Sequence, residues 1–297
     1  LQIGSDAPAT RTLTLSSSWD RTTVSGIISQ GSAAGLLIKA GNGQLILSGN
    51  NSYEGLTTIS AGVLNIRHAN ALGSTAAGTS LAASTTLQIQ GGITTAAEPL
   101  SLNGAGFGGA AAYSIQNGAL VNVSGDNTYA GLVTLAAAAT ISSDSGSLAL
   151  SHSGTITGAF AVTLTGPGNG RIDSVIGTGV GAINKSGTGT WALTGANTST
   201  GLLTVSNGIL RLGNGTSGSW TTTPALTFSG LGTFDYRSLD TGSEQGLGAL
   251  TFSAGDGTVQ ATYGSSGTSA LTFTSLVART VGATGNFIVS GGENGIS

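Results

Sequence analysis

The fold is decided by residues 39–64, KAGNGQLILSGNNSYEGLTTISAGVL, because other parts of the chain repeat their pattern. Short runs at residues 45–47, 57–59 and 63–66 combine branched apolar residues with Thr or Asn, which is typical of strands. The Gly, Asn and Ser residues between these runs are typical of tight turns. No window of about 10–12 residues keeps the 3.6-residue period of a helix. The sequence therefore predicts an all-β fold.

The same frame returns twice further along the chain, and repeat-like segments span residues 37–66, 120–142 and 183–213. Each copy has a Gly, an Asn two residues later and then a Gly-Leu pair. The frame positions are Gly49, Asn51, Tyr53 and Gly55 in the first copy, Gly125, Asn127, Tyr129 and Gly131 in the second, and Gly195, Asn197 and Gly201 in the third. We expect these residues to be structural, with the Asn side chains turned inward at turns.

Each copy has the length of about one coil of a β-solenoid, at about 20–25 residues per coil. A single coil cannot bury its apolar side chains, so its stability comes from the coils stacked on either side. The copies lie several coils apart and do not stack directly on one another. The sequence predicts a right-handed parallel β-helix of roughly 12–14 coils, forming one continuous domain over residues 1–297.

The composition excludes several classes of protein. Charged residues make up 7% of the chain and Gly occurs 51 times, whereas about 25% charged residues is typical. The nine basic residues are spread thinly, although nucleic-acid binding needs a dense basic face. No apolar run reaches the roughly 20 residues of a membrane span. The chain has no Cys, which excludes disulfides and thiolate chemistry.

The frame Lys-x-Gly-x-Gly-x-Leu-x-Leu-x-Gly-x-Asn-x-Tyr-x-Gly resembles the autotransporter-associated β-strand repeat, also called the passenger-associated transport repeat. Residues 39–64 match this frame almost throughout, and residues 185–210 match it with Ser199 in place of the Tyr. Residues 122–135 match in part and retain Tyr129. The resemblance implies a β-helix passenger segment of a large secreted bacterial protein, located outside the cell or on its outer surface.

One group of residues is a candidate for chemistry: Asp235, Tyr236, Arg237, Asp240 and Glu244. Polysaccharide lyases and hydrolases with a β-helix fold need clustered carboxylates. A polysaccharide-degrading enzyme is therefore the alternative function. We favour the interpretation of this group as a polar loop at the edge of a coil.

Other candidate sites are weaker. His68 and His152 lie far apart in the sequence, whereas a metal site needs its ligands close together. The Gly-rich stretch 166–173 faintly resembles a calcium-binding nonapeptide, but it occurs once, without tandem copies. We therefore predict no catalytic residue, no metal and no cofactor.

The three tryptophans, Trp19, Trp191 and Trp220, are candidates for a glycan-binding face. Trp191 occupies a strand position that Leu45 holds in the first copy. This equivalence favours ordinary packing or a surface row over a ligand platform.

The sequence predicts a structural or adhesive role as an extended rod and no enzymatic activity. Leu1–Ile3 and Phe287–Val289 read as strands without a polar cap. Uncapped solenoid ends favour either continuation into further repeats or head-to-tail stacking of subunits into a fibre. The expected partners are further copies of the chain, in head-to-tail or lateral assembly, or a host, matrix or glycan surface. Neither nucleic acid nor a membrane span is expected.

Overall fold

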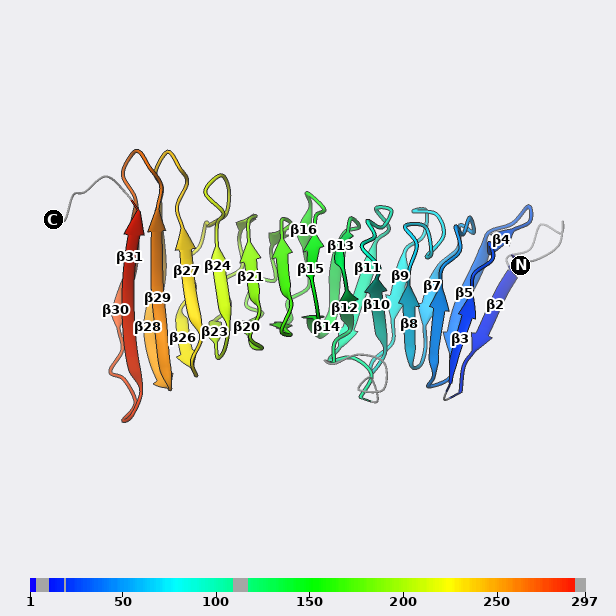
Figure 1. The fold of residues 1–297 in the computed structure, drawn as a ribbon, viewed down its shortest axis with the longest axis horizontal. Coiled ribbons are helices and arrows are strands. Elements are labelled where there is room, and N and C mark those ends of the chain that lie inside the picture. The colour runs from blue at the N-terminus through cyan, green and yellow to red at the C-terminus, as the bar shows by residue number, and fades with distance from the viewer. Residues whose placement is uncertain (4–10, 19, 109–116, 292–297) are drawn as a thin grey trace. The chain divides into compact units, whose positions relative to one another are not determined.

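The computed structural model describes residues 1–3, 11–18, 20–108 and 117–291. The chain forms two compact units, Leu1–His152 and Ser153–Ser297, called here the N-terminal and C-terminal units. The chain winds through about 11 turns of parallel strands and contains no helix in the described part (Figure 1). The predicted all-β parallel solenoid is confirmed, whereas its continuity over residues 1–297 stays a prediction.

Most strands of the N-terminal unit have two to six residues, and one has 11. They are β1 (Gln2–Ile3), β2 (Arg11–Ser16), β3 (Arg21–Val24), β4 (Ser29–Gln30), β5 (Gly35–Ala40), β6 (Gln44–Leu47), β7 (Thr57–Ile59), β8 (Val63–Ile66), β9 (Thr79–Leu81), β10 (Thr86–Gln90), β11 (Leu100–Gly104), β12 (Leu120–Ser124), β13 (Asp126–Tyr129), β14 (Val133–Ser143) and β15 (Ser147–Leu150).

The C-terminal unit ends in longer strands. Its strands are β16 (Thr155–Ile156), β17 (Val162–Thr165), β18 (Asn169–Ile172), β19 (Val175–Ile176), β20 (Ile183–Lys185), β21 (Thr190–Leu193), β22 (Ala196–Asn197), β23 (Leu203–Val205), β24 (Ile209–Leu212), β25 (Ser219–Trp220), β26 (Leu226–Ser229), β27 (Thr233–Arg237), β28 (Glu244–Ala254), β29 (Asp256–Tyr263), β30 (Ala270–Leu276) and β31 (Thr284–Gly291).

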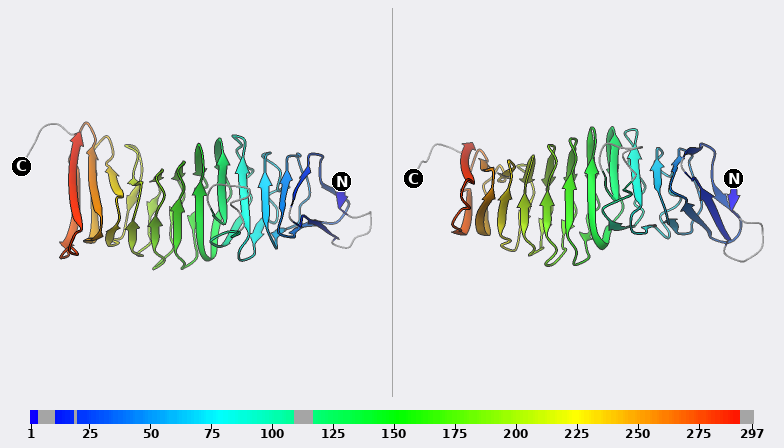
Figure 2. Two further views of the ribbon diagram at one scale, coloured as in Figure 1. Left: turned by 60° about the horizontal axis from the view of Figure 1, so that its bottom comes forward. Right: turned by 90° about the horizontal axis from the view of Figure 1, so that it is seen from below.

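Two long ladders of parallel strands form the walls of each unit (Figures 1 and 2). In the N-terminal unit they are β2–β5–β7–β9–β11–β14 and β3–β6–β8–β10–β12–β14. In the C-terminal unit they are β17–β20–β23–β26–β28–β30 and β18–β21–β24–β27–β29–β31. Successive coils therefore place equivalent residues on top of one another.

The core of each unit is built from columns of inward-facing apolar side chains. In the N-terminal unit, Leu45, Leu64 and Leu87 stack in register and are buried. In the C-terminal unit, Trp191 stacks on Leu210, and both are fully buried. Because each layer covers the next, the apolar area leaves water only when several coils are stacked.

The side chains on the opposite face of β6, β8 and β10 are also buried. Three of them carry amides that are hydrogen-bonded to one another. The Gln44 and Asn65 side chains both donate to Gln88 Oε1, at 2.6 and 3.0 Å. All three side chains are buried. In the C-terminal unit the equivalent strands β21 and β24 alternate between buried and half-buried positions, whereas β27 in the same ladder also buries Asp235 on the opposite face.

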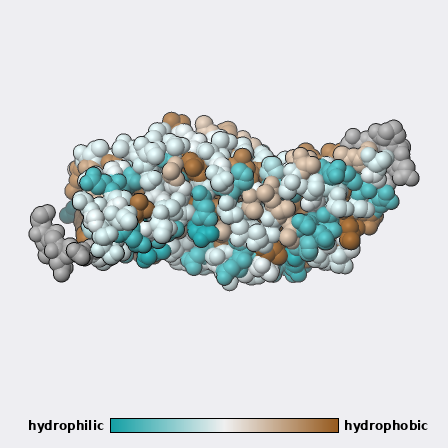
Figure 3. All heavy atoms as spheres, turned by 90° about the horizontal axis from the view of Figure 1, so that it is seen from above, coloured by the Kyte–Doolittle hydropathy of each residue, from teal (hydrophilic) through white to brown (hydrophobic). Residues whose placement is uncertain are grey.

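Residues of intermediate hydropathy make up most of the face in Figure 3, and strongly hydrophilic residues are scattered over it. This surface agrees with the low content of charged residues. Within the described ranges, no helix has the length and apolar character needed to cross a bilayer.

Candidate functional site

The Asn of the repeat frame connects three successive coils. Asn51 Oδ1 accepts the backbone N–H of Ile28, in the preceding coil, at 2.8 Å. Asn51 Nδ2 donates to the Ala71 carbonyl, in the following coil, at 2.6 Å. Both polar groups of the Asn51 amide therefore form hydrogen bonds with buried backbone groups of the neighbouring coils. We call this arrangement the asparagine clip.

The third copy builds the same clip. Asn197 Oδ1 accepts the Ile176 N–H at 2.9 Å, and Asn197 Nδ2 donates to the Ser219 carbonyl at 3.2 Å. The second copy keeps one half of it, because Asn127 Oδ1 accepts the Ile93 N–H at 2.7 Å. The three Asn side chains reach backbone rather than one another, in agreement with their separation along the chain.

We expect Asn51→Ala to lower the free energy of unfolding by about 2 kcal/mol, because it leaves a buried N–H and a buried C=O without partners. The matched control is Asn50→Ala, since Asn50 is exposed and its side-chain oxygen accepts an exposed hydrogen bond from Asn70 at 2.8 Å. Chemical denaturation followed by circular dichroism measures the difference. Equal losses for the two variants would contradict the role of the clip.

The glycines of the frame lie directly against the backbone of the preceding coil. A methyl group at Gly55 would lie 2.6 Å from the Gly35 carbonyl oxygen, and one at Gly195 would lie 2.5 Å from that of Ser174. The other frame glycines make equivalent approaches: Gly49 to Gly26, Gly125 to Gly92, Gly131 to Glu98 and Gly201 to Gly181. Only a residue without Cβ allows the coils to come this close.

The tyrosines of the frame are buried in the N-terminal unit. The Tyr53 hydroxyl forms a 2.7 Å hydrogen bond with Thr57 Oγ1, and the Tyr129 hydroxyl donates to the Glu98 carbonyl at 2.8 Å. In the third copy Ser199 replaces the tyrosine. There the indole N–H of buried Trp220 donates to the Ser199 carbonyl at 2.7 Å, so the next coil supplies the aromatic ring.

A buried lysine occupies the same place in the first and third copies, and its role was missed in the sequence. Lys39 Nζ donates to the carbonyls of Ala40, Gly41 and Ala61 at 2.9, 2.7 and 2.9 Å. The first two belong to the turn between β5 and β6, and Ala61 belongs to the equivalent turn of the next coil. The ammonium therefore ties two stacked turns together. We call this arrangement the lysine clamp.

Lys185 forms the same clamp. Lys185 Nζ donates to the carbonyls of Ser186, Gly187 and Asn207 at 2.7, 2.8 and 3.0 Å. Both lysine side chains are fully buried, and burial lowers the pKa of each to about 8. At neutral pH the ammonium still carries three protons, one for each carbonyl.

A buried carboxyl group, Glu98, lies in the N-terminal unit and was also missed in the sequence. Thr79 Oγ1 donates to Glu98 Oε1 at 2.6 Å. Burial raises the pKa of Glu98 to about 8, although the Thr79 hydrogen bond opposes the shift. Desolvation by burial raises the pKa of Tyr53 and of Tyr129, and the Glu98 charge raises both further. These two phenols are the titratable neighbours of Glu98.

Glu98 makes the stability of the fold depend on pH. Its pKa of about 8 in the folded state lies above the 4.5 of a free side chain, so the folded chain holds a proton that the unfolded chain loses above pH 4.5. The stabilisation is therefore complete below that value and is lost as the pH rises toward 8. Between pH 5 and 6.5 we expect the free energy of unfolding to fall by about 2 kcal/mol.

Denaturant titrations at these two pH values measure this fall, and Glu98→Gln is the test variant because its amide stays neutral. The Glu98→Gln chain should lose most of the pH dependence, whereas Glu54→Gln, at an exposed position, should retain it. An unchanged pH dependence in Glu98→Gln would show that other groups cause it.

The structure separates the members of the predicted carboxylate cluster. Asp235 is buried on β27, and Arg211 Nε lies 2.7 Å and Arg237 Nε 3.7 Å from its Oδ2. Tyr236 points to the other side of the strand and donates to the Ser243 carbonyl at 2.9 Å. Asp240 and Glu244 are exposed in the loop and strand that follow. The Asp235 carboxylate is therefore engaged in ion pairs with two guanidinium groups.

The other candidates are likewise not gathered. His68 Nδ1 accepts the Asn70 N–H at 3.1 Å, which is a local turn contact. In stretch 166–173, Asp173 pairs with Arg171 at 3.0 Å. Over the described ranges, no group of three or more His, Cys, Asp or Glu side chains is placed to hold a metal ion. Trp191 is buried, and Trp19 lies outside the described residues.

The comparisons with known proteins agree with this geometry. The family model for the passenger-associated-transport-repeat matches residues 37–66 and 183–212. No curated protein and no solved structure matched the chain. The two matched segments contain both lysine clamps and the Asn side chains of both complete asparagine clips. The middle segment 120–142 is not among the matched residues. The chain therefore carries two passenger-associated-transport-repeats, and each spans parts of two successive coils of a parallel β-solenoid that a lysine clamp joins.

Proposed function

We propose that this chain is part of the exported passenger of a bacterial autotransporter and serves as a structural or adhesive solenoid outside the cell or on its outer surface. The observation that carries the proposal is the presence of two transport-repeat segments whose coils share the same buried clamp. In this proposal residues 1–297 form one continuous extended rod without enzymatic activity.

Surface display tests the exported location. The chain is placed between a secretion signal and an outer-membrane translocator, carrying an epitope tag, and intact cells are treated with protease. We expect the tag to be exposed on the cells and to be removed by the protease. Retention of folded chain inside the cell would contradict the proposal.

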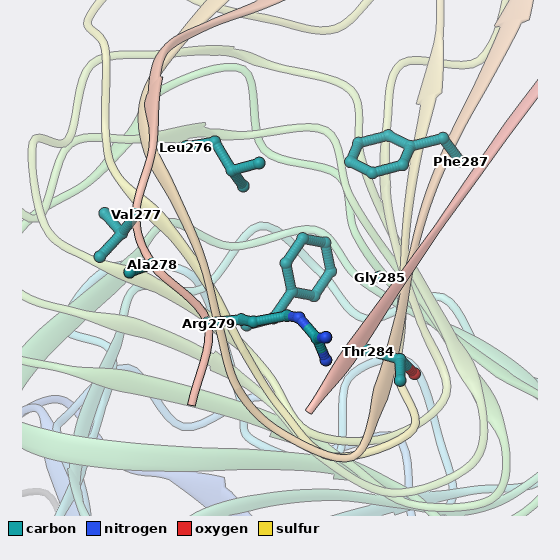
Figure 4. A pocket seen from close by; sticks show the side chains of 8 residues that line it. Leu276, Val277, Ala278, Arg279, Thr284, Gly285 and Phe287 are labelled. Carbon is teal, nitrogen blue, oxygen red and sulfur yellow. The ribbon is translucent and has the colours of Figure 1, made fainter. Parts of the chain in front are cut away.

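In this proposal a coil of a second copy packs on the last described coil and builds a fibre. β30 and β31 expose Leu276, Phe287 and Val289, and Phe287 stacks in register over the buried Val259. A pocket of about 510 Å³, with Leu276 and Phe287 on facing sides and Arg279 at its edge, opens here (Figure 4). A coil from a second copy would extend both ladders and cover this apolar layer.

Sedimentation and electron microscopy of the purified chain test the fibre. We expect concentration-dependent filaments, and Phe287→Asp should abolish them by placing a charge in the contact. The matched control is Val180→Asp, since Val180 is exposed away from this coil. Dispersed monomers at high concentration would contradict the assembly and leave the exported location untouched.

A polysaccharide panel with detection of new reducing ends tests the alternative, a degrading enzyme. We expect no cleavage. Cleavage that is lost in Asp235→Ala and Asp240→Ala would overturn the structural function.

A further inference from the structure

A second pocket, of about 220 Å³, lies in the C-terminal unit between two loops of successive coils. The loops are residues 213–218 and 238–243, which follow β24 and β27 near the top of Figure 1. The lining residues are Thr216, Ser217, Gly218, Ser219, Tyr236, Leu239, Ser243, Glu244 and Gln245. The lining carries hydroxyl, amide and carboxylate groups beside Leu239 and the Tyr236 ring, and it is less apolar than the pocket of the last coil.

Both loops are held in place by their own hydrogen bonds. Asn214 Oδ1 accepts the backbone N–H groups of Thr216 and Ser217 at 3.0 and 2.9 Å. The Asp240 N–H donates to the Gly215 carbonyl at 2.7 Å, and this bond joins one loop to the other. The pocket is therefore formed before any ligand arrives, which reduces the entropy cost of binding.

Some of the lining groups are already used by the fold. The Gln245 side chain accepts the Trp220 N–H at 2.8 Å and donates to the Trp220 carbonyl at 3.1 Å. The Tyr236 hydroxyl is bonded to Ser243. In the described part of the chain, the Glu244 carboxylate and the Ser219 hydroxyl have no such partner. These two groups are thus free to bind a ligand.

The size and charge of the pocket restrict the ligand. Its volume is smaller than the roughly 300–1,000 Å³ typical of sites for drug-sized molecules, so it fits one small ring. The lining has one carboxylate and no cation, which disfavours anions. A carboxylate accepts hydrogen bonds at both oxygens, so it suits a ligand that presents adjacent hydroxyl groups.

We propose that this pocket binds one neutral sugar residue of a glycan, with Glu244 accepting hydrogen bonds from two adjacent hydroxyls and Ser219 bonding a third. Glycoside hydrolysis uses two carboxyl groups about 5–10 Å apart that flank the scissile bond. Among the lining residues only Glu244 carries one, so the pocket binds sugar without cleaving it. The site gives the adhesive part of the proposed function a ligand and does not depend on fibre assembly.

Saturation-transfer NMR and calorimetric titration of the whole chain at pH 7 test this site with glucose, galactose, N-acetylglucosamine and glucuronate. We expect at least one neutral sugar to bind and glucuronate to bind at least tenfold more weakly. Glu244→Gln should weaken the neutral sugar about tenfold and remove the discrimination against glucuronate. Ser219→Ala should weaken binding severalfold, and Glu54→Gln, in the N-terminal unit, should change nothing.

Absence of binding by all three neutral sugars would overturn the proposal, as would equal binding by Glu244→Gln with discrimination intact. Circular dichroism spectra of the variants that match the parent chain show that any loss of binding is not a loss of fold. A failure here leaves surface display and filament formation unaffected, so the two proposals are tested separately.

Discussion

Lys39→Met and Lys185→Met should each lower the free energy of unfolding by about 3 kcal/mol. Met keeps most of the aliphatic stem but supplies no donor, so three carbonyls that face Nζ lose the ammonium in each case. Of these, the Ala40 carbonyl still accepts the Ser17 N–H at 3.1 Å. Each uncovered buried carbonyl costs about 1–3 kcal/mol. Relief from desolvation of the charge, which is also why the pKa is lowered, offsets part of this loss.

Denaturation curves with two probes measure this effect. Trp191 and Trp220 give a fluorescence signal from the C-terminal unit, and hydrogen exchange of β5–β8 reports on the N-terminal unit. Arg171→Met is the control, because Arg171 is exposed and paired only with Asp173 in the described structure. If the lysine variants were no less stable than Arg171→Met, the clamp would contribute nothing to the fold.

Gly55→Ala should also be strongly destabilising, by about 3 kcal/mol. The added methyl group would lie 2.6 Å from the Gly35 carbonyl oxygen and 2.7 Å from its carbon. Both atoms belong to the backbone of the preceding coil, so relief requires the coils to separate and their strand pairing to weaken. The backbone of Gly55 has no left-handed φ, and the effect therefore comes from the contact alone.

Gly26→Ala is the matched control for this contact. Nothing lies within 4 Å of a methyl group at Gly26, and its backbone is not left-handed either. For Gly26→Ala we expect the free energy of unfolding to stay the same or to rise by about 0.4–1 kcal/mol, because Ala lowers the conformational entropy of the unfolded chain. Thermal and denaturant unfolding of the two variants gives the comparison. Similar stability of both would mean that the coils are not closely stacked at Gly55.

The strand and turn pattern of residues 39–64 was enough to predict the fold class. Branched apolar runs punctuated by Gly and Asn are compatible with few other folds, and a recurring frame favours stacked coils. The count of about 11 turns is slightly lower than expected because some coils are longer than 25 residues. Leu87, for example, pairs with Leu120 in the next coil.

The buried polar groups could not be predicted from the sequence. Lys39 follows Leu-Leu-Ile at the end of a strand, and a lysine there is usually solvated. Its burial depends on carbonyls from two turns that converge only when the coils stack. Glu98 is hidden for the same reason, since Thr79 comes from another coil. The residues around Asp235 are close in the sequence but are separated in the structure. Side chains alternate along β27, so Asp235 and Tyr236 point to opposite faces of the strand.

The two lysine ammonium groups give the most direct test of the clamped-coil structure. Lys39 and Lys185 are the only lysines in the chain, so lysine labelled with ¹³C and ¹⁵N produces two side-chain signals in an NMR spectrum. We predict slowly exchanging ammonium protons and a pKa of about 8 for both. Two rapidly exchanging groups that titrate near 10.5, as free lysine does, would contradict the clamp in both repeats.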